Sequence, residues 1–182
     1  MMERYNDVQI ALHWLIALLI FATFPLGLYM VDLKLSPTML KLFSYHKWIG
    51  VTIFFLVAIR LAWRATHPVP PPITGMPRWQ EIVSVATHHT LYLLMVVIPL
   101  SGWLTSSADG YQTVWFGIVP LPDLLDKSKA LGETLGSVHE TLNWIMLALV
   151  TLHVAAALKH HFIDKDGLLQ RMNPFSAGKQ AS

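Results

Sequence analysis

The sequence predicts an all-α protein, a bundle of four helices that cross a membrane. Of its 182 residues, 54% are hydrophobic and only 13% are charged, which is about half the charged fraction of an ordinary soluble domain. Several apolar runs exceed the roughly 18 residues that a helix needs to cross a bilayer. We therefore expect one compact transmembrane domain over residues 1–182, with the lipid bilayer as its surroundings.

The first two predicted spans cover residues of about 8–31 and 39–64. Residues 8–31 contain no charged side chain, so this run is long enough to cross the bilayer and too long for the apolar part of a signal peptide. The second span has an uncharged core at residues 48–59 only. We expect Arg60 and Arg64 to extend it, because long basic side chains reach from an apolar segment to the membrane interface.

The third and fourth predicted spans cover residues of about 82–106 and 137–161. The whole of the third span and the central part of the fourth are uncharged. The segment His67–Pro77 before the third span is rich in proline, which favours an extended connection. Residues 109–136 are expected to form a loop whose apolar patch, VWFGIVPLP, lies at the interface, and residues 164–182 are expected to form a polar tail.

Charge and composition predict orientation and exclude some functions. Four spans put both termini on one side, and a cytoplasmic placement puts eight of the 13 Lys and Arg residues inside, including every arginine. The positive-inside rule therefore predicts cytoplasmic termini. With no cysteine, the chain cannot hold an iron–sulfur cluster or a thioether-attached haem. A net charge of +2 without a basic cluster gives no reason to expect nucleic-acid binding.

Histidines recur at two depths of the predicted bundle. His139 and His153 are 14 residues apart, so they lie within about 40° of the same helix face and roughly 21 Å apart along the axis. His13 matches the depth of His153, and His46 matches that of His139. An imidazole inside a membrane is costly unless it is used, and two neutral imidazoles per iron suit b-type haem. Gly27, 14 residues after His13, would leave room for a bulky planar group.

Other polar residues could serve the same cofactors. His89 lies near the inner level, but its helix lacks a second histidine 14 residues on, so a haem propionate or a quinone suits it better than iron. Arg60 is expected to pair with a propionate of the inner haem, because a guanidinium at that depth needs an anion. His160 and Lys159 could hold a quinone carbonyl or relay protons to it. Taken alone, each of these two is more often a simple interfacial residue.

Five motifs carry a resemblance to a known family. They are ALHWL around His13, YHKWIG around His46, THHTLYLL in the third span, VHETLNW around His139, and LHVAAALKHHFIDKDGLLQRM at the end of the chain. The chain resembles the bacterial cytochrome b561 family over nearly its whole length. This resemblance implies two non-covalent haem b groups, ligated from the first, second and fourth helices, which agrees with pairing His13 with His153 and His46 with His139.

The resemblance also implies a function in the bacterial inner membrane. Proteins of this kind pass electrons between a periplasmic donor and the quinone pool, and stand-alone members are associated with superoxide oxidation and ubiquinone reduction. We therefore expect an oxidoreductase of the superoxide:quinone type, whose donor is superoxide or a redox protein. Two alternatives stay open: a cytochrome b subunit that anchors a partner dehydrogenase, and a haem-free histidine relay for protons or metal ions. The sequence does not assign the direction of transfer, the oligomeric state, or the roles of His88 and His161.

Overall fold

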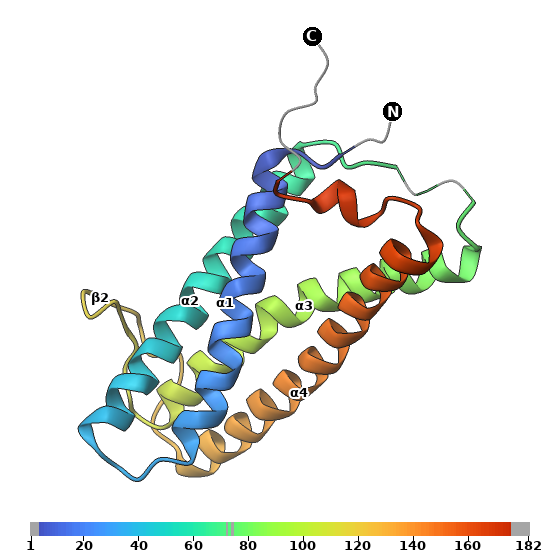
Figure 1. Cartoon of the computed structure of the whole chain (residues 1–182). Helices are drawn as coiled ribbons and strands as arrows, with labels where there is room; N and C mark the ends of the chain where they lie inside the picture. Colours follow the sequence, from blue (N-terminus) through green and yellow to red (C-terminus); the bar gives the residue numbers. More distant parts are fainter. Residues whose placement is uncertain (1–3, 72, 74, 176–182) are drawn as a thin grey trace.

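The structure is a computed structural model that describes residues 4–71, 73 and 75–175, and four long helices dominate it (Figure 1). The helices are α1 (Asp7–Val31), α2 (Pro37–Thr66), α3 (Arg78–Ala108) and α4 (Lys129–Lys159). All four are long and apolar enough to cross a membrane, where only helices or closed barrels satisfy every backbone polar group. The prediction of an all-α bundle with four spans is therefore confirmed.

Polar caps determine where the helices begin. At the start of α1, the Asn6 side chain accepts a hydrogen bond from the Gln9 N–H, and the Gln9 side chain accepts one from the Asn6 N–H; this is a capping box. Ser36 caps α2, and Pro37 occupies its first turn, where the missing N–H costs no hydrogen bond. Ser128 caps α4. Because a helix begins at its cap, α4 starts several residues before the predicted span.

The helices pack mainly as two pairs, α1 with α2 and α3 with α4, and α2 also packs against α3. Each pair contains a buried apolar cluster. The cluster of the first pair consists of Ile16, Ile53 and Val57. The cluster of the second pair consists of Leu94, Ile98 and Met146. Many other large apolar side chains are exposed, as expected of helices whose surroundings are lipid.

The expected loop at residues 109–136 contains regular structure. Its last eight residues belong to α4, so the loop prediction was wrong there. Ahead of them, β1 (Val114–Trp115) pairs antiparallel with β2 (Val119–Pro120). The indole N–H of Trp48 donates to the Val114 carbonyl at 2.6 Å, and that of Trp115 donates to the Thr52 hydroxyl at 3.2 Å. These bonds hold the hairpin against α2 (Figure 1).

The chain after α4 folds back over the end of the bundle instead of trailing away as a polar tail. We call residues 160–173 the return segment; it contains a π turn (His160–Asp164) and a 3-10 turn (Leu169–Met172). Figure 1 shows it crossing from the end of α4 toward the start of α1. Trp14 donates its indole N–H to the Met172 carbonyl at 2.8 Å, and the Tyr5 N–H donates to the Arg171 carbonyl at 3.3 Å. We call this end of the bundle the terminus end, and the opposite end, which carries β1 and β2, the hairpin end.

Asp166 stabilises the return segment in a pH-dependent way. Its carboxylate lies 2.5 Å from His160 Nδ1 and accepts a hydrogen bond from the Leu168 N–H at 3.0 Å. Desolvation alone would raise the pKa of Asp166, but the Leu168 N–H and His160 outweigh it, and the pKa is lowered. A carboxyl group whose pKa is lower in the folded state stabilises that state above its unfolded pKa, and this stabilisation is lost as the pH falls through the folded pKa.

We therefore expect Asp166→Asn to lower the Tm at pH 7 by about 2–4 °C, the effect of roughly 1 kcal/mol in a protein of this size. The difference from the wild type should shrink as the pH is lowered below about 4, because the wild-type carboxyl then becomes protonated. Thermal unfolding of both proteins over a pH series measures this. Glu133→Gln is the control, because Glu133 belongs to an exposed ion pair with Lys129 at 3.9 Å and such pairs contribute little. An equal Tm difference at every pH would contradict the prediction.

Candidate functional site

Four histidines form two facing pairs inside the bundle. The ring centres of His13 on α1 and His153 on α4 are 6.3 Å apart, with an interplanar angle of 70°. Those of His46 on α2 and His139 on α4 are 6.2 Å apart, with an angle of 79°. The first pair lies toward the terminus end and the second toward the hairpin end. The structure thus brings together the two pairs that sequence spacing and depth proposed.

The separation within each pair suits a metal ion held between two imidazoles. Two metal–nitrogen bonds of about 2 Å each, together with the two half-rings behind the nitrogens, span roughly 6 Å. Both pairs have this spacing. Bis-imidazole ligation is one of the ways in which a protein holds haem iron, so the histidine pairs fit that cofactor.

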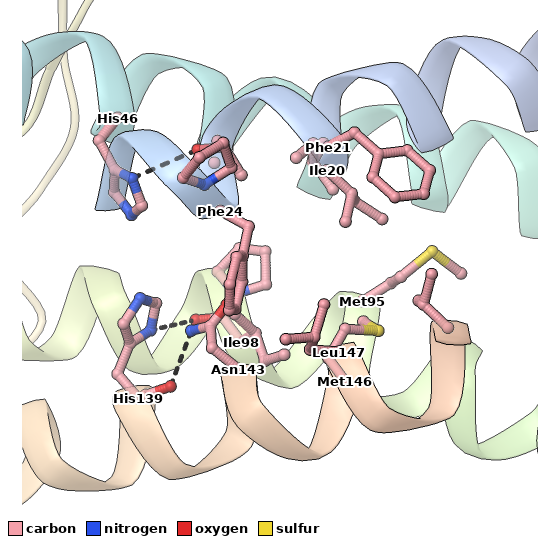
Figure 2. Close-up of a pocket in the computed structure, with 16 residues that line it drawn as sticks. Ile20, Phe21, Phe24, His46, Met95, Ile98, His139, Asn143, Met146 and Leu147 are labelled. Atoms are coloured by element: carbon pink, nitrogen blue, oxygen red, sulfur yellow. Dashed lines mark hydrogen bonds between the residues drawn. The ribbon is translucent and has the colours of Figure 1, made fainter. Parts of the chain in front are cut away.

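An apolar cavity of about 110 Å³ adjoins the pair at the hairpin end. Figure 2 shows the rings of His46 and His139 facing each other from opposite sides of it. Its other walls include Phe24, Met95, Ile98 and Met146. Gly50 also lines the cavity, and a Cβ atom placed there would meet no atom within 4 Å. An enclosed, mostly apolar space beside two ligating groups suits a flat hydrophobic cofactor.

Hydrogen bonds set the orientation of the two rings at this end. The Nδ1 atom of His139 lies 3.1 Å from the Ile98 carbonyl oxygen and 3.0 Å from the Ser101 hydroxyl. Because a carbonyl only accepts, Nδ1 carries the hydrogen and Nε2 keeps a lone pair for a metal. The Nδ1 atom of His46 lies 3.3 Å from the Thr23 hydroxyl. Sequence reasoning missed Thr23 and Ser101, because such contacts depend on how neighbouring helices are rotated.

Two glycines make room for these rings. A Cβ atom at Gly102 would lie 2.9 Å from Cε1 of His139, and one at Gly27 would lie 3.1 Å from Cε1 of His46. Both distances are closer than ordinary carbon contacts. The sequence had suggested that Gly27 accommodates a planar group beside His13. In the structure, the planar group against Gly27 is the His46 imidazole.

A third imidazole lies beside the pair at the terminus end. The ring centre of His88 is 5.1 Å from that of His153, and its Nδ1 donates to the Ser84 carbonyl at 2.7 Å. His89, which the sequence analysis had singled out, is exposed and bonds through Nδ1 to the Val85 carbonyl. The apolar pattern of α3 runs around the whole helix at this level, so it could not predict which of the two adjacent histidines faces the pair.

Arg60 also lies at the terminus end, as predicted. Its Nε donates to the Tyr92 hydroxyl at 2.9 Å, and its guanidinium interacts electrostatically with His13. A cation at this position is suited to bind an anionic group near the imidazoles.

The two residues predicted to hold a quinone have carboxylate partners. His160 is buried, and its Nδ1 lies 2.5 Å from Asp166. The Nζ atom of Lys159 lies 2.6 Å from Asp164. The charge of Lys159 is therefore compensated within the protein, whereas His160 has only one ring nitrogen engaged by Asp166 and Asp164.

Comparison with known proteins points to one family. A family model described as prokaryotic cytochrome b561 matches residues 4–174. Cytochrome b561 homolog 2 of Escherichia coli (strain K12) is 38% identical over 171 residues, which cover 93% of this chain and 91% of the relative. Cytochrome b561 homolog 1 of the same organism is 30% identical, covering 95% and 98%. A Yersinia pestis protein named probable superoxide oxidase CybB is 27% identical, covering 98% and 100%.

Proposed function

The chain belongs to the prokaryotic cytochrome b561 family, and from this premise we propose that it transfers electrons across the bacterial inner membrane, from a periplasmic donor to membrane quinone. The observation that carries the proposal is the facing pair of imidazoles at each end of the bundle, with ring centres 6.3 and 6.2 Å apart. Two non-covalent b-type haems would supply the one-electron redox chemistry. Four helices that can span a membrane place the two sites at different depths.

In this proposal, His13 and His153 bind one haem iron, and His46 and His139 bind the other. The hydrogen bonds to Nδ1 of His139 hold its ring so that Nε2 points into the site. Such outer contacts orient a ligand and raise its basicity. The protein contributes axial ligation, fixed geometry and an apolar surrounding that excludes water.

We propose that both termini lie in the cytoplasm, which puts the His46–His139 pair on the periplasmic side. The distribution of basic residues supports this orientation, because every arginine of the chain then lies inside. A periplasmic donor would approach the hairpin end, and quinone would react at the terminus end.

We propose superoxide as the donor, supported by the name of the Yersinia pestis relative. Two superoxide ions would each release one electron and leave as O₂. One ubiquinone would take up the two electrons and two protons and become ubiquinol. The protein would then be an oxidoreductase of the superoxide:quinone type.

His160 is the residue that we propose to deliver a proton to the quinone. Asp166 holds its Nδ1, which leaves Nε2 to exchange a proton, the arrangement found wherever a carboxylate orients a general acid or base. Lys159 would act through its ion pair with Asp164. His89, exposed on α3 at the same end, is proposed as a partner for a haem propionate or the quinone.

An optical spectrum of the purified protein tests the proposal. We expect a sharp α-band after dithionite reduction, a pyridine haemochrome value of two haems per chain, and reoxidation by an added ubiquinone analogue. A colourless protein, made with an ample supply of haem, would refute the proposal and favour a haem-free histidine relay. Co-purification of a soluble redox subunit, with no response to superoxide, would favour an anchor subunit instead.

A further inference from the structure

A small polar pocket lies beside the His13–His153 pair at the terminus end. It is lined by Tyr5, Gln9, Arg60, Arg64 and Tyr92, and we call it the arginine pocket. It encloses about 10 Å³, room for roughly one water-sized group. Three helices build it, with Gln9 one turn before His13 on α1 and Tyr92 one turn after His88 on α3.

The two arginines bring positive charge that no acid compensates. None of the ion pairs in the described part of the chain includes Arg60 or Arg64. The hydrogen-bond partner of Arg60 is the neutral Tyr92 hydroxyl, and its guanidinium carbon lies 5.8 Å from the centre of the Tyr92 ring. Arg60 also interacts electrostatically with His13 and His153. A guanidinium at this depth in a membrane calls for an anion, and the imidazoles of the neighbouring site cannot supply one.

Gln9 is a second, independent indication of a ligand. Only 5% of its surface is exposed, and its Nε2 has no hydrogen-bond partner among the residues that the structure describes. Its Oε1 is engaged by the Asn6 N–H at 3.3 Å. Buried polar groups almost always have a partner, so an unpaired amide in this pocket indicates an acceptor that the protein itself does not provide.

We propose that Gln9, Arg60 and Arg64 form a binding site for an oxyanion, and that its ligand is a propionate carboxylate of the haem held by His13 and His153. The inference rests on the proposed function. A carboxylate accepts several hydrogen bonds at once and pairs well with the planar fork of an arginine. The size of the pocket suits one carboxylate group that enters while the rest of its molecule stays outside. The phosphate of an anionic lipid has the same chemistry and is the competing source.

The test compares haem with its dimethyl ester, in which both propionates are blocked. The full-length chain with His139→Ala, prepared without haem, offers the His13–His153 site alone and is the parent protein. The parent should bind haem about 10- to 100-fold more tightly than the ester, the range expected for a hydrogen bond to a charged group. Adding Gln9→Leu or Arg64→Gln should remove most of this preference. Arg78→Gln, which alters an exposed arginine at the start of α3, should leave it unchanged.

An unchanged preference in both pocket variants would overturn the inference while leaving the proposed function intact. If the variants instead abolish a stabilising effect of phosphatidylglycerol vesicles on the parent, the ligand is lipid phosphate and the carboxylate assignment is wrong. A parent that binds no haem would refute the proposed function together with this inference.

A redox titration of the holoprotein as purified checks the same point without haem removal. Arg64→Gln should lower the midpoint potential of one haem, because a lost positive charge disfavours the added electron, and Arg78→Gln should shift neither. Two unshifted potentials in Arg64→Gln would count against the arginine pocket.

Discussion

Replacement of His139 with alanine is expected to reduce the haem content from two per chain to about one. The ring of His139 faces that of His46 at 6.2 Å, and the iron between them would lose one of its two axial ligands. The remaining haem should keep its absorbance, because the His13–His153 pair lies on the other side of the bilayer centre. His153→Ala should remove the other haem, and the double variant should hold none. Haem per chain, measured as pyridine haemochrome, decides the matter.

The matched control for these variants is His89→Ala. His89 is also a membrane histidine, but it is exposed and bonds to the carbonyl of its own helix, so its loss should leave both haems in place. Retention of two haems by His139→Ala would show that the iron ligands have been misassigned. The rate of quinone reduction by an external donor should fall to the background level in either single variant, because each lacks one of the two redox centres.

Gly102→Ala should weaken haem binding at the hairpin end by at least about tenfold, the effect of disturbing the groups that orient a metal ligand. The new Cβ atom would lie 2.9 Å from Cε1 and 3.2 Å from Nδ1 of His139. Since both neighbours belong to one ring, the imidazole must move as a whole. Its hydrogen bonds to Ser101 and to the Ile98 carbonyl would then be strained or lost. Haem content and the reduced spectrum of the purified variant measure the effect.

Gly136→Ala is the control, because a Cβ atom there would meet only the Thr105 methyl at 3.7 Å, an ordinary contact. It should keep both haems. Gly27→Ala should give a smaller loss of the same haem as Gly102→Ala, because its Cβ atom would lie 3.1 Å from His46. A full haem content in Gly102→Ala would mean that the His139 ring has more freedom than its contacts suggest.

The four spans could be predicted from the sequence because a long uncharged run has few other ways to satisfy its backbone in a membrane. The pairing of His13 with His153 and of His46 with His139 could be proposed for a related reason. A spacing of 14 residues determines both the face and the height of two side chains on one helix, and depth alone then selects their partners. The loop at residues 109–136 was predicted less well, because the Ser128 cap extends α4 into it.

By itself, then, the sequence determined which segments cross the membrane and at what depth each histidine lies, because both follow from local composition and helix geometry. The tertiary structure decided what faces what. It turned His88 rather than His89 toward His153, set Gly102 against His139, and collected Gln9, Arg60 and Arg64 from two helices around one pocket. The physical reason is that a helix apolar on every side carries no periodic signal of its own rotation, so that rotation is set only by packing against its neighbours.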